Sequence, residues 1–494
     1  MKKLAVNPYL PFWETVPDGE PHVFDGRVYV YGSHDALKGE AFCVGDYVGW
    51  SAPVDDLSDW RYEGVIYRRD QDPINGGSYD KPLPNYKMGE GRPEEHNLYA
   101  PDVAQGPDGR YYLFYALSGA NVLSVAVCDT PAGQYEFLDY VLLPDGSVPK
   151  QGMMFDPGIL CEESGNYLYY GFCPPVAFAP GMEKLNTDGA FLVKLADDMH
   201  TIVEGPKLVA NGCQTAKGTS YEAHPFFEAS SIRKFGDLYY FVYSSLQGNE
   251  LCYGTAKTPD GPFDFGGVII SNGDMGYQGN TLPTNYMGNN HGGLMEINGQ
   301  LYIFWHRQTH GTMYSRQGCA DKVEILPDGS IPQVEITSCG LNNGPLPAKN
   351  RYESYIACHL TGPDRTKVGG VIMARPGQSL PPLPAEMPYI TEEDCPSGEK
   401  GLKPYVYNLS TGCLVGFKYL AFDGSEQSLT LELRGKGTIK ALLDSPEGRE
   451  IGRISCDSKT WAQASCPIAN ISGAHALYFA VEDGKLDFAS FTIA

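Results

Sequence analysis

A glycine-containing turn followed by an aromatic strand recurs five times in the first 300 residues of the chain. A tight turn that leads into a run of Tyr, Phe, Val and Ile is typical of a hairpin entering a buried strand. The turn glycines are 56 to 83 residues apart, which leaves room for one four-stranded sheet per copy. This spacing predicts a five-bladed β-propeller. The copies are FDGRVYVYGS from Phe24, PDGRYYLFYA from Pro107, ESGNYLYYGF from Glu163, KFGDLYYFVYSS from Lys234 and INGQLYIFWHR from Ile297.

Each copy also carries an ionisable residue seven to nine positions before its turn glycine: Asp18, Asp102, Asp156, Glu228 and His291. In a propeller the first strand of every blade lines the central axis, so residues at this shared position converge there. Carboxylates brought together repel one another and are costly to bury, which indicates a chemical role. Taken singly, an acid before Pro or Gly is ordinary turn chemistry. That interpretation suits Asp156 in FDPGI best, so no catalytic role is predicted for it.

Composition and charge agree with an all-β protein that acts on neutral molecules. The 494 residues include 33 Tyr, 58 Gly and 37 Pro, and no long segment has apolar residues at helical spacing. A formal net charge of −23 argues against nucleic acid and anionic membranes as partners, whereas it does not disfavour carbohydrate. The N-terminus lacks a signal-peptide core, and 13 cysteines, an odd number, are typical of free thiols. We therefore expect a cytoplasmic protein; the oligomeric state is not predicted.

The periodicity ends after the fifth copy, and the chain is predicted to divide there. Residues 1–343 are expected to form a catalytic propeller, and residues 344–388 a Pro- and Gly-rich junction with some strand content. From 389 to 494, short alternating strands separated by Gly, Asp and Ser predict a jelly-roll-like β-sandwich. The predicted fold class is therefore all-β, a five-bladed propeller followed by a sandwich.

Three of the axial residues have the chemistry that glycoside hydrolysis needs. Cleavage of a glycosidic bond uses one protonated and one ionised carboxyl group, and a third carboxyl can adjust their pKa values. Asp18, Asp102 and Glu228 come from three different copies. A second carboxylate beside Glu228 raises the pKa of Glu228 and keeps it a proton donor at neutral pH, while a better solvated aspartate stays ionised as the base.

Other residues near the copies are candidates for holding a sugar or an ion. Trp13 and Trp50 offer aromatic faces for a sugar ring, and Arg307 follows an apolar strand from which it could hydrogen-bond hydroxyl groups. The alternatives are core packing for the tryptophans and a surface ion pair for Arg307. His291 stands where the other copies carry acids, so it is a candidate ligand for one axial calcium ion or a donor to the acids. No organic cofactor is expected.

These motifs resemble glycoside hydrolase family 43, whose members are inverting enzymes with a five-bladed β-propeller. NPYLP and VPDGEPHVF resemble the motif of the family's general base, which implies that role for Asp18. YAPDV implies that Asp102 adjusts the pKa of the acid, and FFEASSIRK implies that Glu228 is the general acid. YGSHD places His34 and Asp35 near the pocket, and in many members an axial histidine helps to bind calcium. The C-terminal region resembles carbohydrate-binding module family 6.

The resemblance implies an O-glycosyl hydrolase that removes terminal α-L-arabinofuranosyl or β-D-xylosyl residues from hemicellulose-derived oligosaccharides. An insert from Asp70 to His96 is longer than a blade loop requires, and as a lid over the pocket it would favour exo action. Other interpretations remain open. They are a sugar-binding propeller without turnover, and a family member that acts on another furanoside, such as a galactofuranoside, or on arabinan.

Overall fold

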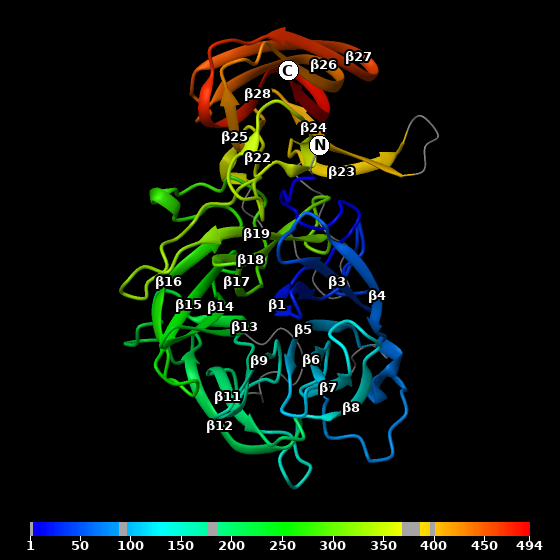
Figure 1. The fold of residues 1–494 in the computed structure, drawn as a ribbon, viewed down its shortest axis with the longest axis vertical. Helices are drawn as coiled ribbons and strands as arrows, with labels where there is room; N and C mark the ends of the chain where they lie inside the picture. Colours follow the sequence, from blue (N-terminus) through cyan, green and yellow to red (C-terminus); the bar gives the residue numbers. More distant parts are fainter. Residues whose placement is uncertain (1–2, 88–95, 176–185, 368–385, 396–400) are drawn as a thin grey trace.

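The computed structural model describes residues 3–87, 96–175, 186–367, 386–395 and 401–494. Within these ranges the chain is all-β, with strands, short 3₁₀ helices and no α-helix. A ring of sheets carries a second, curved sheet that contains the C-terminus (Figure 1). The predicted fold class, an all-β chain with a five-bladed propeller, is confirmed.

Four blades of the described chain are four-stranded antiparallel sheets whose strands follow chain order. Blade 1 consists of β1 (Glu20–Phe24), β2 (Arg27–Tyr31), β3 (Tyr47–Pro53) and β4 (Arg61–Tyr67). Blade 2 consists of β5 (Leu98–Gln105), β6 (Tyr111–Leu117), β7 (Leu123–Cys128) and β8 (Glu136–Tyr140). Blade 3 consists of β9 (Gly158–Glu162), β10 (Gly165–Tyr170), β11 (Gly189–Leu195) and β12 (Ile202–Asn211). Blade 4 consists of β13 (Phe226–Phe235), β14 (Leu238–Ser245), β15 (Glu250–Ala256) and β16 (Asp264–Ser271).

The fifth blade closes the ring with help from the N-terminal segment. It contains β17 (Leu294–Ile297), β18 (Gln300–Gln308) and β19 (Arg316–Val323). Beside β19, the Asn7 side chain donates to the carbonyl of Ala320 at 2.9 Å and accepts from the N–H of Ala320 at 2.8 Å. Around the axis, β1 contacts both β5 and β17, so the five inner strands form a closed ring.

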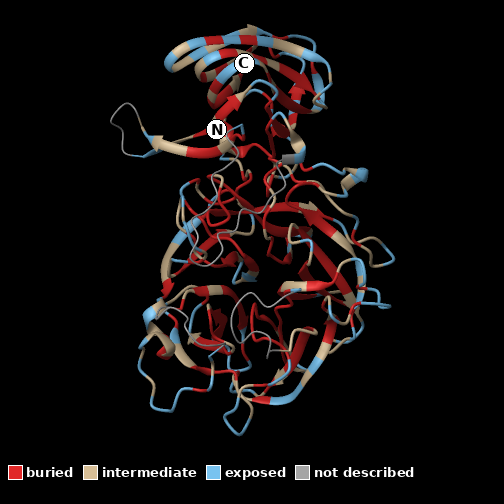
Figure 2. Cartoon of the chain, turned by 180° about the vertical axis from the view of Figure 1, so that it is seen from behind, coloured by how far each residue is buried: buried red, intermediate tan, exposed pale blue. Residues whose placement is uncertain are grey.

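The repeated turns and strands have the local structure that their residues dictate. Asp25 and Gly26 connect β1 to β2 with φ angles of 48° and 74°, and Asn298 and Gly299 connect β17 to β18 with 51° and 77°. Positive φ at both central residues is typical of the type I′ turn, which Asp-Gly and Asn-Gly adopt readily. Strand β6, with sequence YYLFYAL, is buried at all seven positions. Buried residues are concentrated inside the propeller, and exposed residues lie mainly on its outer strands and loops (Figure 2).

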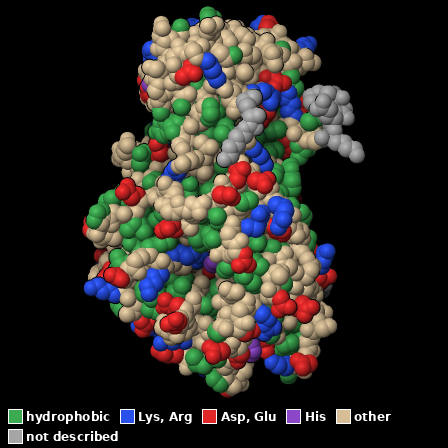
Figure 3. All heavy atoms as spheres, in the orientation of Figure 1, with side chains coloured by type: hydrophobic (Ala, Val, Ile, Leu, Met, Phe, Trp, Pro, Cys, Tyr) green, Lys and Arg blue, Asp and Glu red, His purple; other side chains and the backbone are tan. Residues whose placement is uncertain are grey.

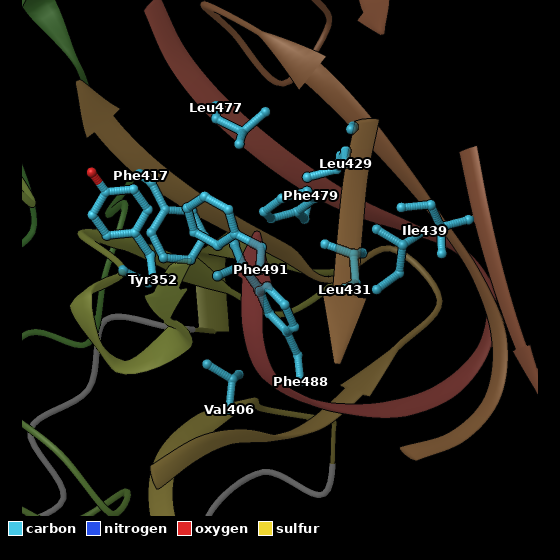
Figure 4. Close-up of a cluster of buried hydrophobic side chains, with 14 of the residues drawn as sticks. Tyr352, Val406, Phe417, Leu429, Leu431, Ile439, Leu477, Phe479, Phe488 and Phe491 are labelled. Atoms are coloured by element: carbon cyan, nitrogen blue, oxygen red, sulfur yellow. The ribbon is translucent and has the colours of Figure 1, made fainter. Parts of the chain in front are cut away.

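The C-terminal strands form one nine-stranded sheet in the described residues, curled around a large hydrophobic core. Strand β28 is its centre, because it pairs with β21, β24, β25 and β26. Tyr352 of β21 packs beside Phe417 and Phe491 in this core (Figure 4). The strands are β20 (Leu346–Pro347), β21 (Arg351–Glu353), β22 (His359–Thr361), β23 (Tyr389–Asp394), β24 (Leu402–Ser410), β25 (Leu414–Asp423), β26 (Ser428–Leu443), β27 (Glu450–Pro467) and β28 (Ser472–Ile493).

The segment predicted as a junction, residues 344–388, contributes strands to the C-terminal sheet. Strands β20 and β22 pair with β25, and β21 pairs with β28. Residues 368–385 of this segment lie outside the described residues. The short 3₁₀ helices in the described part of the chain are η1 (Arg69–Gln71), η2 (Pro73–Asn75), η4 (Tyr277–Gly279), η5 (Ser354–Ile356) and η6 (Arg365–Lys367).

The surface agrees with the scattered charge of the sequence. Acidic and basic side chains are interspersed over the visible face, without a continuous basic stripe there (Figure 3). Among the described residues, no helix has the length and apolar character needed to cross a membrane.

Candidate active site

A cavity of about 270 Å³ lies at the starts of the inner strands, around the propeller axis. Its ionisable lining comes from four blades: Asp18 precedes β1, Asp156 precedes β9, Glu228 lies in β13, and the fifth blade supplies both His291, before β17, and Arg316, at the start of β19. Apolar side chains form most of the remaining wall. They are Phe42, Tyr99, Met153, Phe155, Phe172, Phe227 and Met313.

The backbone at the three cavity acids departs from regular strand geometry. Asp18 has a φ of 57°, Asp156 a φ of 46°, and Ala229, directly after Glu228, a φ of 71°. Residues other than glycine seldom adopt this left-handed region, and such strain is typical of functional sites. Register shifts on both sides of Glu228 in β13 mark a bulge, which re-aims a side chain. The Ala229 N–H donates to Asp156 Oδ2 at 3.0 Å, which ties blade 4 to the aspartate of blade 3.

Asp18 is buried beside a permanent positive charge. Arg316 Nη1 lies 2.9 Å from Asp18 Oδ1. The Asp18 N–H donates to His306 Nδ1 at 3.2 Å, and His306 Nε2 lies 2.7 Å from the Asn289 carbonyl, so this histidine is neutral with its proton on Nε2. Burial lowers the pKa of His306 to about 3, which agrees with that tautomer. Burial is the largest single effect on Asp18 and opposes its ionisation, but several smaller contributions, of which that of Arg316 is the largest, together hold the pKa of Asp18 below its usual value.

Glu228 has the opposite electrostatic environment. Burial, together with the charge of Asp18, raises the pKa of Glu228 to about 8 despite the opposing effect of Arg316. Burial and the neighbouring Glu228 and Asp18 also raise the pKa of Asp156 well above its usual value. Asp156 and Glu228 therefore resist simultaneous ionisation, and the pair keeps a proton at neutral pH. The cavity holds an ionised aspartate together with a carboxylic acid, as glycoside hydrolysis requires.

Asp102, predicted to adjust the acid, does not line the cavity. Its side chain is fully buried, and Oδ1 lies 2.6 Å from His22 Nε2 and accepts the N–H of Val103 at 2.8 Å. Its Oδ2 accepts the N–H of Ile159 at 2.8 Å. The structure thus brings together Asp18 and Glu228 as expected, but the third carboxyl in the cavity is Asp156, to which the sequence analysis gave no catalytic role.

His34 and Asp35 lie behind the cavity wall. Asp35 accepts two hydrogen bonds from the guanidinium of Arg316, at 2.8 Å from Nε and 3.0 Å from Nη2. This bidentate pairing fixes the plane of the guanidinium, which in turn holds Asp18. His34 Nε2 lies 3.0 Å from Glu14 Oε1 and so does not reach the cavity lining.

The predicted sugar-contacting side chains Trp13, Trp50 and Arg307 are also outside the cavity lining. Trp50 is buried, and Trp13 is 52% exposed with its ring centroid 5.8 Å from that of Trp50. Arg307 is buried, and its Nη1 donates to the carbonyl of Ala357 at 2.8 Å while its Nη2 donates to that of Tyr355. These bonds hold Arg307 against the segment that leads into the C-terminal sheet, and they differ from the surface ion pair considered as its alternative.

Next to the cavity, two buried atoms fit an axial cation. Glu20 Oε1 and His291 Nε2 lie 3.9 Å apart, and neither atom has a hydrogen-bond partner among the residues that the structure describes. The neighbouring cluster of Glu20, His22 and Asp102 already has a positive charge beside it. This charge is the Arg233 guanidinium, whose Nη2 donates to Glu20 Oε2 at 2.9 Å. Calcium takes oxygen ligands, including water, and accepts an imidazole as a minority ligand. The residues present therefore fit one hydrated cation between Glu20 and His291.

Sequence reasoning missed Arg316 and His306, and it underrated Asp156. Arg316 is the first residue of β19 and belongs to no recognisable motif or spacing in the sequence, so nothing marked it as a partner of Asp18. The sequence did mark Asp156 as a candidate, since it occupies the same position before the turn glycine as the other axial acids. The insert expected to cover the pocket is described as far as Lys87, and Asp72 within it is buried under hydrogen bonds from blade 2. Residues 88–95 of the insert lie outside the described residues.

A propeller with this pair of carboxyl groups at its axis has the acid and the base that a glycoside hydrolase needs. Comparison with known proteins agrees with this class of enzyme. Residues 51–331 match the family model of glycosyl hydrolases family 43. The chain belongs to glycoside hydrolase family 43.

Relatives of known name cover the whole chain. The chain is 45% identical to a xylosidase/arabinosidase of Thermoclostridium stercorarium over 507 residues, which covers 100% of this chain and 99% of the relative. It is 25% identical to an arabinoxylan arabinofuranohydrolase of Paenibacillus polymyxa, over 96% of this chain and 70% of that protein. Among solved structures, a family 43 β-xylosidase/α-arabinofuranosidase from a compost microbial metagenome matches 68% of this chain and 98% of its own, with a TM-score of 0.50 and 24% identity. This last likeness concerns the fold.

Proposed function

We propose that the protein is an inverting, exo-acting glycoside hydrolase that removes terminal α-L-arabinofuranosyl or β-D-xylosyl residues from hemicellulose-derived oligosaccharides. The carrying observation is one cavity at the propeller axis that holds Asp18 ionised and Glu228 protonated. Its volume of about 270 Å³ is at the small end of ligand pockets, which supports binding of a single terminal sugar. The xylosidase/arabinosidase name of the relative that matches the entire chain supports the choice of sugars.

In this mechanism Asp18 is the general base and Glu228 the general acid. Glu228 protonates the leaving oxygen while Asp18 takes a proton from the water that attacks the anomeric carbon on the opposite face. Inversion requires the two carboxyl groups to stand about 6.5–9.5 Å apart, so that this water fits between base and sugar. Arg316 keeps Asp18 ionised before the reaction. After turnover the proton on Asp18 and the charge on Glu228 are exchanged with solvent.

Asp156, in place of Asp102, adjusts the acid. It lines the cavity beside Glu228, and the two carboxyl groups compete for ionisation. Its bond from the Ala229 N–H also fixes the backbone directly after Glu228, which orients the acid. Asp102 then has a structural role, joining the inner strands of blades 1, 2 and 3 through His22 and Ile159.

Glu20 and His291 are the residues that would hold an axial calcium ion. Bound there, the ion would offset the negative charge of the carboxyl groups around the axis.

All 13 cysteines are free thiols, which supports a reducing compartment such as the cytoplasm.

Nitrophenyl glycosides carrying α-L-arabinofuranosyl, β-D-xylosyl or β-D-galactofuranosyl groups test the proposal. We expect turnover of at least one of the first two, and a Glu228→Gln variant that loses about 10²–10⁴-fold in kcat on substrates needing acid assistance while still binding sugar. Glu222→Gln, at an exposed position close in sequence, is the control and should behave as wild type. Sugar binding without turnover by the wild-type protein would favour a lectin-like propeller, and preferential cleavage of the galactofuranoside would favour the other furanoside activity.

A further inference from the structure

One carboxylate of the C-terminal sheet reaches two loops of the propeller. Glu392, in β23, has Oε1 at 2.8 Å from Lys38 Nζ, and its Oε2 hydrogen-bonds His310 Nε2. The Glu392 side chain is 7% exposed and that of His310 only 1%. A backbone bond reinforces the contact, because the His310 N–H donates to the carbonyl of Ile390 at 2.9 Å. The sheet and the propeller are thus joined at a buried, charged contact.

Both loops form walls of the candidate active site. The first, residues 35–43, carries Phe42, and the second, residues 309–316, carries Met313 and Arg316; all three side chains line the cavity. His310 is fixed within the second loop as well, since its Nδ1 lies 2.9 Å from Ser315 Oγ, one residue before Arg316. A displacement of His310 is therefore transmitted to Arg316 through a single residue.

The two loops also contact each other around the guanidinium of Arg316. Phe42 packs edge-on against Tyr314, with ring centroids 4.5 Å apart, and the Arg316 guanidinium carbon lies 4.8 Å from the centroid of the Phe42 ring. Thr312 Oγ1 donates to the carbonyl of Gly39 at 3.3 Å. Lys38 and His310, the partners of Glu392, thus belong to the same assembly that sets the position of Arg316 against Asp18.

We propose that Glu392 is a positioning residue for hydrolysis, through which the C-terminal sheet holds both pocket loops and keeps Arg316 on Asp18. The inference rests on the proposed function. It gives the C-terminal sheet a part in turnover that does not depend on binding carbohydrate. The contact between Glu392 and His310 is almost completely buried, so it can hold its loop more firmly than a solvent-exposed pair would, and the partly exposed Lys38 adds a weaker second contact.

Substitution at Glu392 tests the proposal, with its neighbour as the matched control. Glu392→Ala should lower kcat/KM by about 10- to 100-fold through misplacement of catalytic groups, with most of the loss in kcat. It should also move the acidic limb of the pH profile to higher pH, because Arg316 no longer fully lowers the pKa of Asp18. Glu393→Gln removes an ion pair to Arg434 within the C-terminal sheet and should leave kcat and the limb unchanged.

Hydrogen exchange reports on the loops directly. Peptides covering residues 35–43 and 309–316 should exchange faster in Glu392→Ala than in wild type or Glu393→Gln. If Glu392→Ala does not fold, Lys38→Met removes one of the two contacts from an exposed position and should give the same changes at smaller size. The proposal would be overturned if the wild type is active and the Glu392 and Lys38 variants have the same kcat, the same acidic limb of the pH profile and the same hydrogen exchange in the loops. A wild type without turnover on any glycoside would refute the proposed function instead. Hydrogen exchange of the two loops would still test whether Glu392 holds them.

Discussion

Arg316 Nη1 lies 2.9 Å from Asp18 Oδ1, although 298 residues separate the two in sequence. Both side chains are buried, and the same guanidinium forms a bidentate pair with Asp35. Because an isolated buried carboxylate would take up a proton, this contact explains how Asp18 can remain an anion at the end of an apolar cavity.

Removal of Arg316 should therefore affect both stability and activity. In Arg316→Met, Asp18 and Asp35 lose their counter-charge, and we expect a loss of about 3–5 kcal/mol in the free energy of unfolding at neutral pH. The low folded-state pKa of Asp18 contributes stability above its unfolded pKa, and this contribution disappears as pH falls through the folded value. Urea unfolding at several pH values should show the deficit shrinking toward acid. A deficit that is constant with pH would contradict this role.

Asp156 and Asp102 should separate into a functional and a structural residue. Asp156→Asn removes the carboxyl that competes with Glu228 for a proton, so kcat should fall and the basic limb of the pH profile should move. Asp102→Asn disturbs buried bonds to His22 and Ile159 and should cost about 1–3 kcal/mol of stability, with the pH profile unchanged at temperatures where it is folded. Paired measurements of thermal unfolding and pH–rate profiles check this. The reverse pattern would restore Asp102 as the adjusting residue.

The pKa shifts predict a broad, bell-shaped dependence of kcat/KM on pH. In the proposed mechanism activity requires a protonated Glu228, so it should fall above about pH 8. It also requires Asp18 ionised, and because the pKa of Asp18 lies below its ordinary value of 3.8, the acidic limb should lie below that pH in wild type. Initial rates at low substrate concentration measure both limbs. A basic limb near the ordinary glutamate value would show that Glu228 is not the proton donor.

Calcium should bind once per chain, at the axis. We expect chelation to lower the melting temperature and added calcium to restore it, because the ion binds only the folded chain. Calorimetric titration of calcium into Glu20→Gln and His291→Gln should show weakened binding, whereas Glu296→Gln, in β17 close to His291 in sequence, should bind as wild type. Calcium binding that all three variants retain would place the ion elsewhere.

The repeat pattern was sufficient to predict the propeller, because each copy encodes its own turn and buried strand. The Asp25-Gly26 and Asn298-Gly299 turns adopt positive φ as those residue pairs favour, and all the axial residues except Asp102 lie just before or near the start of an inner strand. Asp18, Glu228 and His291 reach the cavity for this reason.

What the sequence could not show is how each axial side chain is turned. Asp102 and Asp156 share the axial position, but Asp102 lies within β5, where strand geometry directs it into the interior against His22, whereas Asp156 precedes β9 in a left-handed conformation that directs it into the cavity. Arg307 and Arg316 differ likewise, since only tertiary packing decides which of two buried arginines faces the acids.

The most direct test of the account is proton NMR of the first sugar released from an aryl glycoside that the wild-type enzyme cleaves. With Asp18 as a base that activates water, the first-formed anomer should have the configuration opposite to that of the substrate and should then mutarotate. A first product of retained configuration would mean that a carboxylate attacks the sugar, and it would remove Asp18 from its role as general base.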